Sequence, residues 1–293
     1  MKQSPMQHYT IKDFDKHFPD DDACLEWLKN SRWPNGICCS SCKQVTKHHR
    51  ITKRPAYACG ICGNHVYPMA GTILEHSATP LRLWFHAMFL MASTRCGISA
   101  KQLQRELGVT YKTAWRMFKQ IRQMLDEDVM SLLQQVEVDE TYIGGKRHGK
   151  RGRGAEGKTV VMGMVERKGK VIAKVVPDVK AGTLVPIVRE KVLPRSVVYT
   201  DELHSYDSLP KLGYQHKRVH HASKVYVMGD AHTNTIEGFW SLVKRGIDGT
   251  HHAVSAKYLQ DYINAYSFRW NHRNDEEPMF LQILSRLIPS LQA

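Results

Sequence analysis

The sequence lacks any long hydrophobic run, and none approaches the roughly 18 apolar residues that a membrane-spanning helix requires. Its N-terminal segment, residues 1–30, also lacks the apolar core of a secretory signal peptide, so secretion is not expected. Cysteine is absent beyond Cys96, which confines cysteine chemistry to the N-terminal third. We therefore expect a cytoplasmic protein in a reducing environment, where metal binding is favoured over disulfides.

Acidic residues are also scarce relative to basic ones. The chain has 28 Asp and Glu against 42 Lys and Arg, which gives a formal net charge of +14 over 293 residues. Such an excess most often reflects a polyanionic partner, nucleic acid first and an anionic membrane surface second. Because 42% of the residues are hydrophobic, the chain is not disordered, and its length suits about two domains with real cores.

Five of the seven cysteines lie within residues 38–62. Cys39 with Cys42 and Cys59 with Cys62 form two C-x2-C pairs sixteen residues apart, a spacing typical of structural zinc sites with four thiolates. Disulfides or a redox pair are the alternatives, and Cys38 could replace Cys39 as a ligand. Zinc ribbons contact DNA or protein, and basic residues between the pairs favour DNA: Lys43, Lys47, Arg50, Lys53 and Arg54.

A helical pattern over residues 80–133 contains a candidate helix-turn-helix at 97–122. Ser99 would cap its first helix, Gly108 would supply the turn, and Thr110 would cap the second helix. A helical hairpin with a solvated basic face is the alternative. As a recognition helix, the second helix would present basic side chains to a major groove, among them Lys112 and Arg116.

From residue 136 the sequence contains runs rich in β-branched residues. These runs predict four strands, of which the second and third form an antiparallel hairpin. A helix is expected over residues 182–192, and amphipathic helices follow from residue 232. This mixed order indicates an α/β or α+β domain over about residues 135–285. The predicted strands are 136–141, 159–165, 171–176 and 196–200.

A strongly basic segment, residues 146–158, lies between the first two predicted strands and carries six Lys or Arg against one Glu. We expect a loop that contacts DNA phosphates in a salt-dependent way. Its expected DNA-binding residues are Lys146, Arg147, Lys150, Arg151 and Arg153.

Three acidic residues lie where the fold could bring them together: Asp139 on the first predicted strand, Asp201 at the end of the fourth, and Glu237 near the start of a predicted helix. In an RNase H-like sheet the first and fourth strands are adjacent and parallel, so the aspartates would meet at one sheet end. A helix running back over the sheet would bring Glu237 to the same point.

Three converging carboxylates repel one another unless divalent cations hold them, and hard oxygen ligands suit Mg²⁺ or Mn²⁺. Two such ions can promote phosphodiester cleavage. Lys244, seven residues after Glu237, would share its helix face and bind a phosphate. Glu140 and Glu202 are rival ligands. His232 and Asn234 would position DNA or a metal-binding carboxylate, or cap the helix, and Trp240 is expected in the core.

In this order the zinc-ribbon motif, the segments Gly71-Thr-Ile-Leu and Thr79-Pro-Leu-Arg-Leu-Trp, the helix-turn-helix and the three acidic motifs form a pattern over about residues 15–285. The pattern resembles bacterial ISXO-like insertion-sequence transposases, members of the DDE superfamily related to the Merlin elements. The resemblance implies a multidomain α+β chain: a zinc ribbon with a helical extension (1–70), a helix-turn-helix module (71–134) and an RNase H-like catalytic domain (135–293).

The resemblance further implies that Asp139, Asp201 and Glu237 bind Mg²⁺ or Mn²⁺ and catalyse DNA cleavage and strand transfer, with structural Zn²⁺ in the ribbon. The expected partner is double-stranded DNA, at transposon ends and target, bound by at least a dimer near the bacterial nucleoid, with no membrane involved. A non-catalytic DNA-binding regulator and a structure-selective nuclease are the competing hypotheses.

Overall fold

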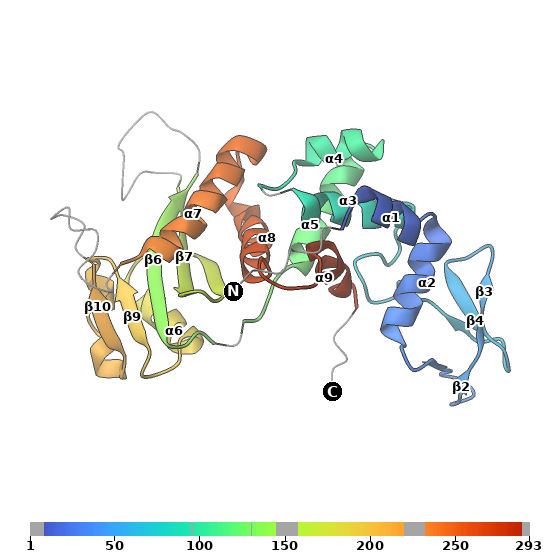
Figure 1. Cartoon of the computed structure of the whole chain (residues 1–293), viewed down its shortest axis with the longest axis horizontal. Helices are drawn as coiled ribbons and strands as arrows, with labels where there is room; N and C mark the ends of the chain where they lie inside the picture. Colours follow the sequence, from blue (N-terminus) through green and yellow to red (C-terminus); the bar gives the residue numbers. More distant parts are fainter. Residues whose placement is uncertain (1–8, 95, 130, 145–157, 220–231, 289–293) are drawn as a thin grey trace. The chain divides into compact units, whose positions relative to one another are not determined.

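The computed structural model describes residues 9–94, 96–129, 131–144, 158–219 and 232–288 (Figure 1). The chain divides into two compact units, one formed by Met1–Met124 with Asn274–Ala293 and the other by Leu125–Arg273. Among the described helices, none has the length and apolar character needed to cross a membrane.

The first unit joins a small β ribbon to a set of helices. In the ribbon, β1 pairs antiparallel with β2, and β4 lies between β3 and β5 in a second antiparallel sheet. The elements are α1 (Ile11–His17), α2 (Asp21–Arg32), β1 (Ile37–Cys38), β2 (Val45–Thr46), β3 (His48–Ile51), β4 (Ala56–Cys59), β5 (His65–Val66), α3 (Leu81–Ser93), α4 (Ala100–Leu107), α5 (Tyr111–Met124) and α9 (Met279–Ser285).

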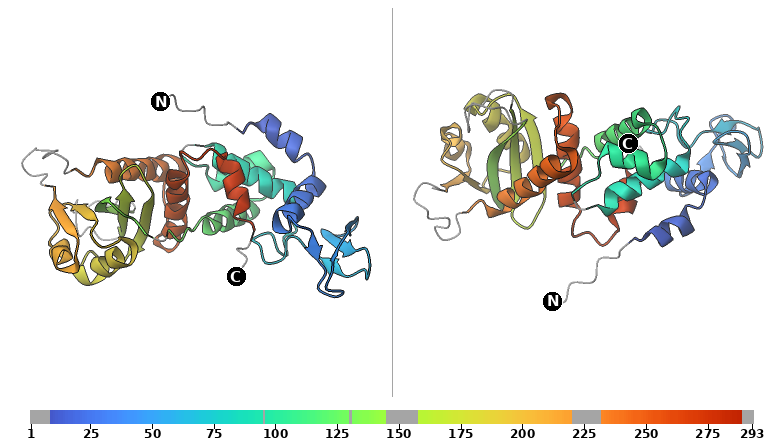
Figure 2. Two further views of the ribbon diagram at one scale, coloured as in Figure 1. Left: turned by 60° about the horizontal axis from the view of Figure 1, so that its bottom comes forward. Right: turned by 90° about the horizontal axis from the view of Figure 1, so that it is seen from above.

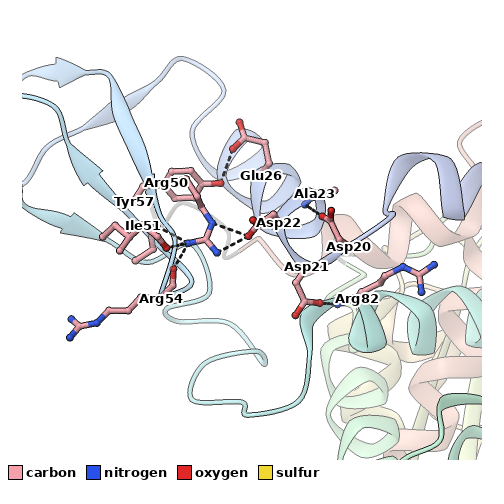
Figure 3. A network of polar contacts seen from close by, with 11 residues as sticks. Asp20, Asp21, Asp22, Ala23, Glu26, Arg50, Ile51, Arg54, Tyr57 and Arg82 are labelled. Atoms are coloured by element: carbon pink, nitrogen blue, oxygen red, sulfur yellow. Dashed lines mark hydrogen bonds and ion pairs between the residues drawn. The ribbon is translucent and has the colours of Figure 1, made fainter.

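Side chains of α2 fasten the ribbon (Figure 3). The Arg50 guanidinium donates to Asp22 Oδ1 from Nη2 at 2.7 Å and from Nε at 3.0 Å. The Tyr57 hydroxyl donates to Glu26 Oε2 at 2.7 Å. The guanidinium of Arg50, one of the basic residues between the cysteine pairs, is thus bound by a carboxylate of this chain.

The two helices of the candidate helix-turn-helix form with the expected caps. Ser99 Oγ accepts from the Gln102 N–H at 3.1 Å, and Thr110 Oγ1 accepts from the Thr113 N–H at 3.3 Å. Gly108 ends α4 in the left-handed conformation, at φ 63°, which glycine adopts without strain. The apolar residues of α4, α5 and the turn between them are buried or half-buried: Leu103, Leu107, Val109, Ala114, Phe118 and Ile121.

The C-terminal helix α9 packs within the first unit. Phe280 on α9 lies against an aromatic cluster, with ring centroids 5.8 Å from Phe14, 5.9 Å from Phe18 and 5.7 Å from Phe89. The predicted catalytic domain ran to residue 293, whereas the compact unit that holds its strands ends at Arg273. Apolar burial between segments distant in sequence accounts for the difference.

The second unit is built on a sheet of five strands in the order β10-β9-β6-β7-β8. β6, β7 and β8 are antiparallel neighbours, β9 pairs in parallel with β6, and β10 pairs in parallel with β9, which is an RNase H-like arrangement. The elements are β6 (Gln135–Ile143), β7 (Thr159–Glu166), β8 (Val171–Val176), α6 (Ala181–Lys191), β9 (Val197–Thr200), η1 (His204–Tyr206), η2 (Leu209–Leu212), β10 (Gln215–Arg218), α7 (Asn234–Gly246), the π-helical turn η4 (Ile247–His251), η5 (Ala256–Tyr258) and α8 (Leu259–Asn271).

Helices cover both faces of this sheet (Figures 1 and 2). One core places Leu184 and Val188 of α6 against Val136 and Val138 of β6. The opposite core places α7 and α8 against the other face, with Trp240 in it. Because side chains alternate along a strand, β6 sends its odd-numbered residues toward α7. Asp139 belongs to that set.

At the outer edge of β8, backbone N–H and C=O groups form hydrogen bonds with side chains of α8 instead of with another strand. The Asn271 amide bonds Val171 N and O at 2.7 and 3.1 Å, and the Gln260 amide bonds Val175 N at 2.8 Å and Ala173 O at 3.1 Å. Covering an edge in this way removes a template for strand addition.

Candidate active site and zinc site

The register between β6 and β9 places Asp139 and Asp201 at the same end of the sheet. β6 and β9 pair in parallel, with Gln135 opposite Val197 and Glu137 opposite Tyr199. Two residues further along each strand direction come Asp139 and Asp201, at the same end of the sheet. The predicted parallel contact between the first and fourth strands is therefore confirmed.

A compact carboxylate group occupies this sheet end. Asp139, Glu140 and Asp201 each offer an oxygen within 4.8 Å of the others'. Glu140 also accepts a hydrogen bond from the hydroxyl of Tyr206, whose burial raises its pKa well above the ordinary value and keeps it a donor. Of the two rivals considered from the sequence, the structure thus brings Glu140 into the group and leaves Glu202 outside it.

Glu237 lies in the first turn of α7 and lines the same groove, of about 740 Å³, with Asp139 and Glu140. The Thr233 hydroxyl orients it by donating to its Oε1 at 3.0 Å. Lys244 and Arg245, exposed on α7, line the groove as well. Two positively charged side chains therefore lie beside the acidic residues of the groove.

Electrostatics at Asp139 fit a bound divalent cation. Burial, followed by the negative charge of Asp201 and then of Glu237, raises the pKa of Asp139 to about 6, against a hydrogen bond from Trp240 that lowers it. A cation would relieve this repulsion, and carboxylate oxygens are the ligands that Mg²⁺ and Mn²⁺ prefer. The donor set therefore fits such a metal.

Trp240 belongs to the core, as predicted, and is 3% exposed. Its Nε1 donates to Asp139 Oδ2 at 3.1 Å. Gly163 lies opposite Asp139 in the sheet, and a Cβ there would come within 2.4 Å of the Trp240 ring. Space at Gly163 thus lets the indole reach the aspartate.

Sequence reasoning missed Glu137, which is 0% exposed and caps the N-terminus of α7. His232 and Asn234 had been considered as the caps, but the N-cap residue is Thr233 and its side chain makes no capping bond. The sequence did hold a signal: Glu137 is an acidic residue inside a β-branched run, without a basic residue next to it. A carboxylate buried in such a strand requires a partner from elsewhere in the fold.

The four predicted zinc ligands converge in the ribbon. Cys39, Cys42, Cys59 and Cys62 have sulfur atoms within 4.8 Å of one another, whereas Cys38 is exposed and outside the group. The Thr46 hydroxyl and the N–H groups of Cys62 and Ile61 lower the pKa of Cys59 to about 5. Burial raises the pKa of Cys42 to about 12, so the fit to a four-cysteine structural site rests on the convergence of the four sulfurs, which bind zinc as thiolates.

Each cysteine pair lies on the same kind of tight turn. The N–H of Lys43 donates to Cys39 O at 2.9 Å, and the N–H of Gly63 donates to Cys59 O at the same distance. Both turn residues have positive φ, 57° for Lys43 and 72° for Gly63. The matching turns aim two sulfurs each at one point.

The expected DNA-binding residues are distributed over separate elements. On α5, Lys112 and Arg116 are exposed, and Arg116 also donates to Thr79 Oγ1 at 2.9 Å. Lys244 is exposed beside Glu237. The basic-loop residues lie outside the described part of the chain: Lys146, Arg147, Lys150, Arg151 and Arg153.

Two protein-family models match the chain: an ISXO2-like transposase domain over residues 131–271 and a transposase zinc-ribbon domain over residues 19–65. A Halobacterium salinarum protein described as an uncharacterized protein in transposable element ISH50 is 32% identical over 277 residues, covering 87% of this chain and 92% of that protein. An uncharacterized transposase-like protein of Haemophilus influenzae is 35% identical over 121 residues, or 41% of this chain and 95% of that protein.

Among solved structures, the Mos1 strand transfer complex matches with 12% identity and a TM-score of 0.29, covering 69% of this chain and 74% of that one. A pre-cleavage Mos1 transpososome matches with 14% identity and a TM-score of 0.27, covering 64% and 74%. Likeness at this level supports no inference about this chain.

Proposed function

The chain belongs to the family of ISXO2-like insertion-sequence transposases, and on this premise we propose that it binds terminal inverted repeats and catalyses DNA cleavage and strand transfer. Asp139, Asp201 and Glu237 are the proposed catalytic residues. The observation that supports this proposal best is that Asp139 of β6 and Glu237 of α7 line one groove together with basic side chains, and that Asp201, which follows β9, has a carboxylate oxygen within 4.8 Å of one of Asp139.

The three carboxylates would hold Mg²⁺ or Mn²⁺. When bound, these cations would polarise the scissile phosphate and favour deprotonation of the attacking hydroxyl or water. Lys244 and Arg245 would bind a neighbouring phosphate as charged donors. Thr233 and Trp240 would orient Glu237 and Asp139 toward the same point.

DNA ends would be gripped by the other unit. The ribbon, folded around Zn²⁺, and the helix-turn-helix would contact the inverted repeats, with Lys112 and Arg116 facing DNA. The basic segment 146–158 would add phosphate contacts, which position a protein without reading sequence. Because two ends must be cut together, at least a dimer is proposed on the DNA, in the cytoplasm at the nucleoid.

The test is divalent-metal-dependent cleavage of a DNA fragment that carries the gene and its own flanks, compared with branched DNA and with unrelated linear DNA. A transposase cuts at the flanking inverted repeats and joins the freed 3′ ends to a second duplex. Zinc-dependent binding without cutting would identify a regulator instead. Cutting confined to branched DNA would identify a structure-selective nuclease.

A further inference from the structure

Glu137 is a fully buried carboxylate beside the proposed active site but not part of it. Its side chain is 0% exposed. It lies on β6 two residues before Asp139, so the two side chains lie on the same face of the strand, the face that α7 covers.

The carboxylate of Glu137 caps α7. Its Oε2 accepts from the backbone N–H of Thr235 at 2.8 Å and of Ile236 at 3.0 Å, and its Oε1 accepts from the Thr235 hydroxyl at 3.0 Å. A carboxylate at a helix N-terminus satisfies orphan N–H groups and complements the helix dipole. The next residue along the helix is Glu237, so this cap fixes the turn that carries the third acid.

Arg167, which follows β7, completes the arrangement. Its Nε donates to Glu137 Oε1 at 2.8 Å, and its Nη2 donates to the His232 carbonyl at 2.7 Å. The guanidinium carbon lies 4.0 Å from the centroid of the Tyr199 ring on β9. A buried carboxylate without a counter-charge would be costly, and Arg167 supplies that charge. The pair therefore adds little negative potential to a site that already gathers acids.

The positions of these contacts follow one rule. Glu137 stands two residues before Asp139, Tyr199 two before Asp201, and Thr235 two before Glu237. The pair Glu137 and Arg167, called here the carboxylate clamp, thus contacts all three segments that carry the proposed catalytic acids, two residues before each acid.

We propose that the carboxylate clamp sets the spacing of the three acids, with Glu137 as a positioning residue for their metal-binding geometry. The inference rests on the proposed function only in that Asp139, Asp201 and Glu237 bind a divalent metal. Partners that orient metal ligands typically change metal affinity by about 10–100-fold when they are removed.

The experiment measures Mn²⁺ binding by electron paramagnetic resonance on the full-length, zinc-loaded chain without DNA, at a temperature where every variant is folded. Glu137→Gln should weaken Mn²⁺ binding by about 10–100-fold. Thr235→Val, which keeps the side-chain shape but loses the hydroxyl, should weaken it less and in the same direction, whereas Thr235→Ser should bind as wild type does. Val188→Ala on α6, buried on the opposite face of the sheet, is the control for general destabilisation.

A second readout is the Mn²⁺ concentration needed for half-maximal DNA cleavage. Glu137→Gln should regain activity at high Mn²⁺, because its carboxylate ligands are intact, and Asp139→Asn should not. Val188→Ala should keep the wild-type Mn²⁺ dependence.

The outcomes separate the two proposals. Equal Mn²⁺ affinity in wild type, Glu137→Gln and Thr235→Val would overturn the clamp and leave the transposase proposal standing. Weakened Mn²⁺ binding in the clamp variants, with no cleavage of element ends even by wild type, would support the clamp and overturn the transposase proposal. A wild-type chain that binds no Mn²⁺ would overturn both.

Discussion

The indole of Trp240 donates a hydrogen bond from Nε1 to Oδ2 of Asp139 at 3.1 Å, although the two residues lie on different elements, α7 and β6. The bond joins the strand of one proposed catalytic acid to the helix of another, because Glu237 lies three residues before Trp240 on α7. Core packing and the geometry of the proposed active site are therefore coupled.

Gly163→Ala should break this coupling. The added Cβ would lie 2.4 Å from Trp240 Cζ2 and 2.9 Å from Ile236 Cδ1, so α7 must shift. We expect a loss of roughly 1–3 kcal/mol in the free energy of unfolding, as for other overpacked cores, and weaker Mn²⁺ binding. Urea unfolding measures the first quantity. Gly182→Ala on α6 is the matched control, because its Cβ meets nothing within 4 Å and alanine favours a helix. Equal stability of Gly163→Ala and wild type would contradict the described packing.

Asp139→Asn should stabilise the metal-free protein at pH 7.5. The folded-state pKa of Asp139 is raised from 3.8 to about 6, so the folded state holds a proton that the unfolded chain releases, and stability falls as pH rises through this window. Removing the charge should recover up to about 3 kcal/mol in zinc-loaded protein without added Mg²⁺ or Mn²⁺, a gain that added Mn²⁺ should abolish by stabilising only the wild type.

Thermal unfolding at pH 5 and 7.5 checks this prediction. Asp178→Asn is the control of opposite sign, because hydrogen bonds from Thr183 and the Lys180 N–H lower the pKa of Asp178. Its carboxylate contributes stability above the unfolded pKa, so Asp178→Asn should lower stability at pH 7.5. An Asp139→Asn protein less stable than wild type without added Mg²⁺ or Mn²⁺ would contradict the account.

Cys39→Ser should remove zinc and unfold the ribbon, whereas Cys38→Ser should do neither. Cys39 belongs to the four-sulfur group and Cys38 does not. Structural zinc supplies much of the folding energy of such small modules, so its loss should expose residues 33–66 to protease. Elemental analysis for zinc with limited proteolysis distinguishes the two serine variants. Reversed behaviour would assign Cys38 as the ligand.

Lys112→Ala should weaken binding to element-end DNA and make the dependence of log K on log salt shallower by about 0.9. The expected cause is the loss of one phosphate contact from the exposed face of α5. Fluorescence anisotropy at several salt concentrations measures the slope. Lys12→Ala, on the exposed surface of α1, should leave the slope unchanged. An unchanged slope in Lys112→Ala would argue that α5 does not face the backbone of DNA.

Local patterns in the sequence predicted much of this architecture. The β-branched runs located β6 to β9, and Ser99, Gly108 and Thr110 act at the helix ends as expected. Cysteine spacing found the four-sulfur group. Each of these signals depends on neighbours within a few residues, where propensity and capping act directly.

Contacts between distant segments were not predictable in the same way. Glu137 with Thr235, Arg50 with Asp22, and Phe280 with Phe14 pair residues far apart in the chain. In both α3 and α7 the capping carboxylate comes from another element, Asp21 and Glu137 respectively, while the helix's own N-cap makes no side-chain bond. A local search for capping residues cannot find such partners. The polar strand β10 was missed because it has no β-branched run.

The most direct test of the central claim is cleavage of element-end DNA by the single variants Asp139→Asn, Asp201→Asn and Glu237→Gln. Each should retain zinc and, without added Mg²⁺ or Mn²⁺, bind end DNA with the affinity of wild type, yet lose cleavage in both Mg²⁺ and Mn²⁺ by at least about 100-fold, since each is proposed to hold the metals. Wild-type cleavage rates in any one of the three would contradict the proposed catalytic triad.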